Sequence, residues 1–186
     1  KVAIDMVAGP SEILIVSDGH SDPRYLAADL LSQAEHDKNA SAVLVTDSLP
    51  LAKAVQAELE RQIPALARAE IARVSIDRNG KIIVARNLDE ALDIANDIAP
   101  EHLELCVDSP FDYLDRVRHS GSVFLGRSCP EALGDYLAGP NHTLPTCGAA
   151  RFSSPLSVDD FVKKTQFTYY TPQAFRGAAE DVDFFA

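Results

Sequence analysis

The sequence predicts an α/β fold, because short aliphatic runs alternate with amphipathic helical stretches along most of its 186 residues. Hydrophobic residues make up 46% of the chain, which is enough for a core and argues against disorder. The formal net charge of −11 makes duplex nucleic acid an unexpected partner, because phosphate binding needs clustered positive charge. No apolar run is long enough to cross a membrane.

The cysteines indicate the cellular compartment of the protein, and the first residue indicates whether the chain is part of a longer one. Cys106, Cys129 and Cys147 are too few and too scattered for a disulfide scaffold, which indicates a reducing, cytoplasmic compartment. The chain starts with Lys1 instead of Met and shows no signal-peptide pattern. We therefore expect it to be part of a longer protein.

The first half of the chain predicts two strand–helix units. Asp22 can cap a helix whose first residue is Pro23, with Leu26, Leu30 and Leu31 at helical spacing after it. A second helix is expected after Asp47 or Ser48. The expected elements are a strand over 13–16, a helix over 23–36, a strand over 42–46 and a helix marked by Leu51, Val55 and Leu59.

Residues 64–80 are compatible with two structures. Leu66, Ala67 and Ile71 suit a helix, whereas Ile76 and the pair Asn79-Gly80 would suit a hairpin. Because alanine and arginine dominate the stretch, we favour a helix that stops at Gly80.

The next part of the chain predicts three further strands. These lie over 81–85, 103–107 and 122–125, with a helix capped by Asn87 and ended by Pro100, and a short helix over about 111–118. Five strand-like runs with helical crossovers predict a mostly parallel, Rossmann-like three-layer sheet covered on both faces.

The pattern changes after Gly126, where glycine and proline are frequent and helical periodicity is lost, so we expect a long functional loop. Most of the aromatic residues lie in the last 35 positions, with helices expected over about 157–164 and 172–180. These helices should pack on the main domain or on another subunit. We expect an α/β domain over 1–147 and a helical, aromatic-rich C-terminal appendage over 148–186.

Polar residues collect at strand ends, where open α/β sheets bind ligands, and the first such group ends the first helix. Gln33 and His36 are three residues apart, so both side chains can point from one helix face to one ion. Imidazole and amide groups can both ligate zinc. Alternatively, His36 is simply a cation at a helix C-terminus.

Two further groups follow. Glu101 and His102 join a helix end to a strand, where histidine could act as a general base and glutamate could activate water, or both could be a solvated pair. The stretch from Gly134 to Thr146 contains Asp135, Tyr136 and His142 between glycines and prolines, which favours a functional loop over a plain surface loop.

Several longer stretches resemble the histidinol dehydrogenase family. They are IDMVAGPSEILIV (4–16), AADLLSQAEHD (27–37), APEHLEL (99–105), GSVFLG (121–126), GDYLAGPNHTLPT (134–146) and GAARFSSPLSVDDFVKK (148–164). The resemblance covers nearly the whole chain, with its motifs in the family's order. It implies a homodimeric enzyme that uses zinc and NAD to oxidise L-histidinol to L-histidine through an aldehyde.

The resemblance also implies roles for individual residues. Gln33, His36 and Asp135 resemble three of the family's four zinc ligands, and Glu101 and His102 resemble its catalytic pair. Ser11 resembles a substrate-contacting serine. Gln33, His36, His102 and Asp135 should also lie near the substrate, and Tyr136 and His142 should line the pocket. With one carboxylate ligand, the zinc site would keep a net charge near +1.

The chain also departs from the family pattern. The region that binds NAD in the family lies upstream of Lys1, and this sequence has no dinucleotide-binding glycine motif. The family's fourth zinc ligand is a histidine in a C-terminal tail that reaches the partner subunit, and no histidine follows His142 here. We therefore expect no cofactor-binding residue for NAD in this chain, weak or no zinc binding, and no activity from this chain alone.

Two other functions are compatible with the residues. The first alternative is a catalytically idle α/β module for binding or dimerisation, which the aromatic C-terminal segment would serve. A metal-dependent hydrolase is less well supported, because such a site would need more carboxylates around the metal.

Overall fold

The computed structural model describes residues 4 and 6–185, apart from the side chain of Asp135. Within this range it contains a parallel sheet of β1 (Glu12–Ser17), β2 (Ser41–Thr46), β3 (Lys81–Val84), β4 (His102–Cys106) and β5 (Ser122–Leu125). The strand order is β3-β2-β1-β4-β5, and all four pairings are parallel. The predicted α/β fold with a parallel sheet is confirmed.

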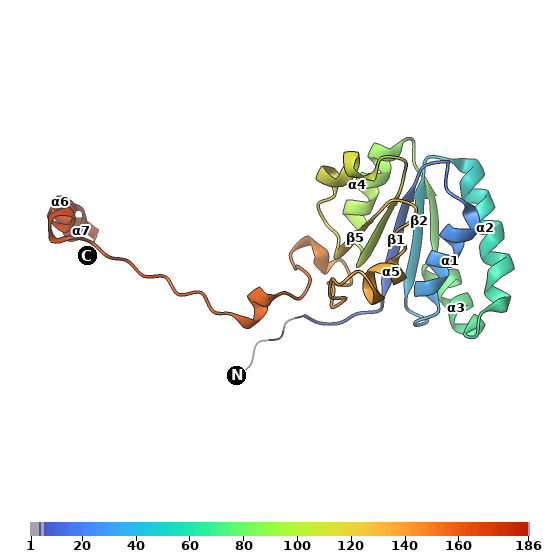
Figure 1. The fold of residues 1–186 in the computed structure, drawn as a ribbon, viewed down its shortest axis with the longest axis horizontal. Helices are drawn as coiled ribbons and strands as arrows, with labels where there is room; N and C mark the ends of the chain where they lie inside the picture. Colours follow the sequence, from blue (N-terminus) through green and yellow to red (C-terminus); the bar gives the residue numbers. More distant parts are fainter. Residues whose placement is uncertain (1–3, 5, 186) are drawn as a thin grey trace.

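Helices cover both faces of this sheet (Figure 1). One face packs against α1 (Pro23–Ala34), α2 (Leu49–Gln62) and α3 (Ala69–Asn79), and the other packs against α4 (Leu88–Ile98). The side chains of β1 alternate accordingly, with Ile13 and Ile15 on the first face and Leu14 and Val16 on the second. Strands that are buried on both faces of a parallel sheet are usually rich in aliphatic residues, which explains the run over 13–16.

Local signals define the helix ends. Asp22 accepts a hydrogen bond from the backbone N–H of Arg24 at the start of α1, and Ser48 and Asn87 cap α2 and α4 in the same manner. The helix predicted within 64–80 is confirmed as α3, and the alternative of a hairpin in this stretch is wrong. Gly80 ends α3 because a Cβ there would lie 2.6 Å from the carbonyl oxygen of Ile76.

Two expectations for the rest of the chain were wrong. The helix α5 (Glu131–Tyr136) lies inside the region expected to be a loop, and the helix expected over 157–164 is a single 3-10 turn over Val158–Phe161. The short helix expected over about 111–118 is present as a 3-10 helix over Pro110–Arg116. A further 3-10 turn spans Ile63–Ala65, and another spans Ala149–Arg151.

The C-terminal segment extends away from the sheet and ends in α6 (Pro172–Gly177) and α7 (Ala179–Phe185) (Figure 1). Its aromatic side chains are exposed, so the expected packing on the main domain is not found in this chain. They include Phe152, Phe161, Phe167, Tyr169, Tyr170, Phe175, Phe184 and Phe185. None of the described helices is long and apolar enough to cross a membrane.

The strand β2, which lies between β3 and β1, supplies a direct test of the core. Leu44 is fully buried between α1 and α2, so Leu44→Ala should lower the free energy of unfolding by about 2–5 kcal/mol through lost burial and a residual cavity. Leu137→Ala, at a side chain that is 80% exposed, should change it by less than about 0.5 kcal/mol. Urea unfolding of both variants checks this, and equal losses would contradict the described core.

Candidate active site

The amino ends of β1 and β4 lie side by side and join two stretches that are about 90 residues apart. The register pairs Ile13 with His102, so Ser11 and Glu12 meet Glu101. Glu101 Oε2 accepts hydrogen bonds from Ser11 Oγ at 2.8 Å and from the backbone N–H of Glu12 at 3.0 Å. The Glu101 carboxylate is therefore buried but held by two donors, which is how a protein keeps a buried charge.

Ser11 also contacts α1. Its Oγ lies 2.5 Å from Oε1 of Gln33, a side chain that is only 1% exposed. A hydroxyl has one proton and cannot donate to both Gln33 and Glu101. If the Gln33 amide were turned by half a turn, Nε2 would donate to Ser11 Oγ while Ser11 donates to Glu101.

His102 is oriented by the backbone of the neighbouring strand. Its Nδ1 lies 2.9 Å from the carbonyl oxygen of Glu12, so Nδ1–H donates and Nε2 is the nitrogen that can accept a proton. Nδ1 is also 3.5 Å from Glu101 Oε2, and Nε2 is 3.9 Å from Glu131 Oε1. A buried histidine with a fixed tautomer between two carboxylates has the arrangement of a general base.

His36 follows the last turn of α1 and is exposed. Its Nδ1 lies 2.7 Å from the carbonyl oxygen of Ser32, so Nδ1–H donates there and Nε2 keeps its lone pair. Metal-binding histidines are commonly oriented in this manner. The nitrogen of His36 and the amide oxygen of Gln33 are both donor types that zinc accepts, so these two residues are chemically compatible with a zinc ion.

The third predicted group is only partly described. Asp135 lies in α5, but its side chain is outside the described part of the structure, so its role as a ligand stays a prediction. Tyr136 is 73% exposed, and His142 is also exposed. The end of this stretch reaches the site, because Thr146 Oγ1 accepts a hydrogen bond from the backbone N–H of Gly9 at 2.7 Å.

The site therefore lies at the amino ends of the strands, whereas ligands of open α/β sheets usually bind outside the carboxyl ends. At the carboxyl ends of β1 and β4, Arg127 bridges Asp18 and Asp108. His20 Nδ1 lies 2.9 Å from Asp108 Oδ2, and with Asp18 these side chains could hold a metal. The hydrogen bond from Arg127 holds the pKa of Asp108 below its usual range, and the hydrogen bond with His20 adds a smaller effect in the same direction.

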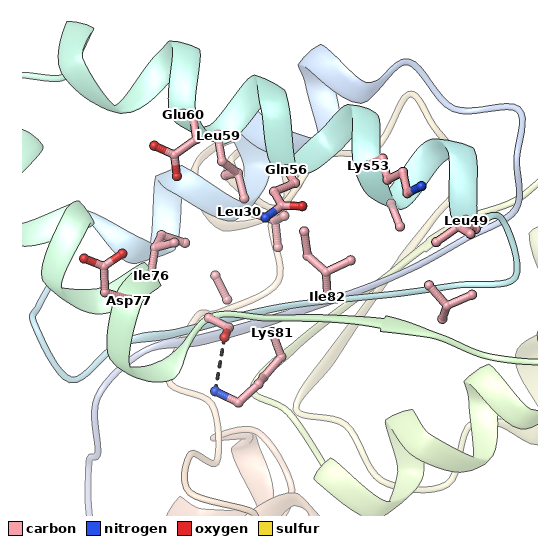
Figure 2. Close-up of a pocket in the computed structure, with 14 residues that line it drawn as sticks. Leu30, Leu49, Lys53, Gln56, Leu59, Glu60, Ile76, Asp77, Lys81 and Ile82 are labelled. Carbon is pink, nitrogen blue, oxygen red and sulfur yellow. Dashed lines mark hydrogen bonds between the residues drawn. The ribbon is translucent and has the colours of Figure 1, made fainter.

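A groove of about 540 Å³ lies elsewhere, between α2, α3 and the edge strand β3 (Figure 2). Its walls are mainly aliphatic, with Lys53, Gln56, Glu60 and Asp77 at their edges. Lys81 Nζ donates a hydrogen bond to the carbonyl oxygen of Gly80. None of the predicted site residues lines this groove.

Four carboxyl groups near the site were not predicted. Glu12 and Glu131 lie next to His102, Glu104 is almost fully buried, and the half-buried Asp29 acts on it electrostatically. Burial, and then the charge of Asp29, raise the pKa of Glu104 to about 8, and burial raises the pKa of Asp29 to about 6. Burial also raises the pKa of Glu12. Of these four groups, Glu104 is the one that the sequence could have indicated, because it is a charged residue inside the apolar run 103–107.

Together these features define a Rossmann-type α/β domain with a candidate Glu–His acid–base pair and candidate metal donors at the amino ends of its strands. The chain belongs to the histidinol dehydrogenase family, whose sequence model matches residues 1–186. Members of this family catalyse the last steps of histidine biosynthesis.

Individual relatives agree with this assignment. The histidinol dehydrogenase of Bacillus cereus is 58% identical over 181 residues, which are 97% of this chain and 42% of that protein. That of Syntrophotalea carbinolica is 58% identical over 171 residues, or 92% of this chain and 40% of that protein. The crystal structure of histidinol dehydrogenase from Elizabethkingia anophelis superimposes with a TM-score of 0.95 at 38% identity, covering 100% of this chain and 42% of that one. The chain thus spans about two fifths of the length of these relatives.

The buried carboxyl of Glu104 should make stability depend on pH. Its pKa is about 8 when folded and near 4.5 when exposed, so between these values the native state holds a proton that the unfolded chain has lost. The free energy of unfolding should therefore fall as pH rises from 5 to 8, by at most about 1.4 kcal/mol per pH unit from this group. Glu104→Gln should flatten the slope in urea unfolding, and an unchanged slope would contradict the assignment.

Proposed function

We propose that this chain is the part of a histidinol dehydrogenase that carries its acid–base pair and three of its zinc ligands. The whole enzyme would oxidise L-histidinol to L-histidine with NAD. The observation that carries the proposal is the contact of β1 with β4, which fixes the tautomer of His102 beside the Glu101 carboxylate. Family membership supports the choice of substrate.

His102 acts as the general base in this proposal. Because Nδ1–H donates to the Glu12 carbonyl, Nε2 accepts the proton of the substrate hydroxyl as hydride leaves the carbon. The imidazolium that forms has Glu101 at 3.5 Å on one side and Glu131 at 3.9 Å on the other. These carboxylates stabilise the positive charge within a site that excludes most water.

Glu101 acts in the second oxidation, which needs a water molecule to add to the aldehyde. Its carboxylate would take a proton from that water, and the hydrogen bonds from Ser11 and the Glu12 backbone fix its position. Ser11 also links Glu101 to Gln33, so the catalytic pair and the metal donors form one hydrogen-bonded group. A change at one member should therefore be felt by the others.

Gln33, His36 and Asp135 would hold the zinc ion, which when bound orients and polarises the substrate while NAD accepts the hydrides. We place the NAD-binding region in the part of the full-length relatives that this chain does not match. The substrate is a small cationic amine, which suits the acidic character of the chain. The cytoplasm is the proposed compartment, in keeping with three free thiols.

The aromatic C-terminal segment favours association with a second copy of the chain. Phe161 and Phe167 are 79% and 91% exposed, and such rings usually mark an interface when they cluster. Homodimerisation is thus part of the proposal. A module that only dimerises, without catalysis, is the second candidate function, and the kinetic experiment below separates the two.

A hybrid enzyme tests the catalytic role. The matching 181 residues of the Bacillus cereus relative are replaced by this chain, and NADH formation from L-histidinol is measured. The parent hybrid should be active, and His102→Gln should lower kcat by about 10²–10⁴ because general-base catalysis is lost. His119→Gln, at a histidine that lies against Asn96 of α4 and outside the site, is the matched control and should leave kcat unchanged. An inactive but folded parent hybrid would favour the idle module.

Sedimentation equilibrium tests the association. The chain should form a dimer at micromolar concentration, and replacement of Phe161, Phe167 and Tyr169 by serine should give a monomer, because these exposed rings lose their apolar contacts. Serine at the exposed positions Val7 and Phe111, outside this segment, is the control. A clean monomer of the unaltered chain at high concentration would contradict the proposed homodimer.

A further inference from the structure

A buried carboxyl lies two residues after the catalytic histidine and has no part in the mechanism above. Glu104 occupies the middle of β4, in register with Ile15 on β1 and with Phe124 on β5. Its side chain is 1% exposed and lies on the same face of the sheet as His102. Burying a carboxyl at this central position is unfavourable, so a compensating role is expected.

The first partner of Glu104 is a helix start. Its Oε1 accepts a hydrogen bond from the backbone N–H of Glu131 at 2.9 Å, and Oε2 lies 3.7 Å from Cys106 Sγ. Glu131 is the first residue of α5, whose N-cap residue, Pro130, makes no side-chain cap. The first N–H groups of a helix have no partner within the helix, so the sheet itself supplies the cap of α5.

A second contact holds the same helix against the neighbouring strand. A Cβ on Gly134 would lie 2.1 Å from Cε1 of Phe124, so only glycine allows α5 this close to β5. Phe124 is the register neighbour of Glu104, and its ring lies 5.9 Å from the ring of His102. Adjacent positions on β4 and β5 therefore seat α5 beside the catalytic histidine.

The helix that is seated in this way carries site residues. Glu131 Oε1 lies 3.9 Å from His102 Nε2, and Asp135, the proposed third zinc ligand, follows one turn later. A helix of six residues is not stable without tertiary contacts, so its position depends on these anchors. Loss of the anchor on β4 would leave His102 in place and move the residues opposite it.

We propose that Glu104 is a positioning residue that caps α5 from β4 and thereby sets Glu131 opposite His102 and fixes the helix that carries Asp135. This inference rests on the proposed function for the roles of His102 and Asp135. The required feature is a carboxyl or amide oxygen at this place, because the hydrogen bond from Glu131 needs only an acceptor.

Two substitutions distinguish positioning from a structural role. Glu104→Gln keeps the acceptor, whereas Glu104→Leu removes it and leaves the N–H of Glu131 without its partner on β4. In this chain, Glu104→Leu should speed amide hydrogen exchange of Glu131–Tyr136 at least tenfold, with β1 unaffected. Glu104→Gln should stay within threefold of the parent, and Glu70→Leu, at an exposed glutamate in α3, is the control.

The same variants are then placed in the hybrid enzyme. Glu104→Leu should lower kcat at least tenfold in a hybrid that urea unfolding shows to be folded, and Glu104→Gln should keep kcat near the parental value. Unchanged exchange in α5, or a Glu104→Leu hybrid with parental kcat, would overturn the inference. An inactive parent hybrid would count against the proposed function alone, because hydrogen exchange in α5 still decides the role of Glu104.

Discussion

The parallel pairing of β1 with β4 is the constraint on which the rest of the site depends. It places Glu12 against Glu101 and His102, and it does so through backbone groups that are fixed by the sheet. The apolar side chains of β1 are almost fully buried on both faces, so a shift of register would expose them to water. The chemistry at the edge of the sheet is thus held by the stability of its core.

Most of the fold follows from the sequence because its signals are local. Asp22, Ser48 and Asn87 are caps within a few residues of the helices they start, and the strand runs are continuous. The helix α5 could not be found in this manner. It is short, it contains Gly134, and its supports are Glu104 and Phe124 on two strands of the sheet. Its stability comes from tertiary contacts, which leave no periodic pattern in the sequence.

The same distinction applies to the site. The pair Glu101-His102 and the spacing of Gln33 and His36 are visible in the sequence as residue types that carry chemistry. The groups that orient them are not, because the Glu12 carbonyl and the Ser32 carbonyl are backbone atoms with no sequence signature. Glu131 is far from His102 in the sequence and comes next to it only when the chain folds. The location at the amino ends of the strands also departs from the usual ligand position, and the Arg127 ion pairs occupy the carboxyl ends instead.

The central claim is that the β1 backbone fixes His102 with its proton on Nδ1, which leaves Nε2 as the base. Two-dimensional ¹H–¹⁵N NMR of the ¹⁵N-labelled chain at a pH where the ring is neutral measures this directly, because the two imidazole nitrogens differ in chemical shift when one carries the proton. The account predicts a protonated Nδ1 and an unprotonated Nε2 at His102. A ring protonated on Nε2, or one that averages between the two tautomers, would contradict it.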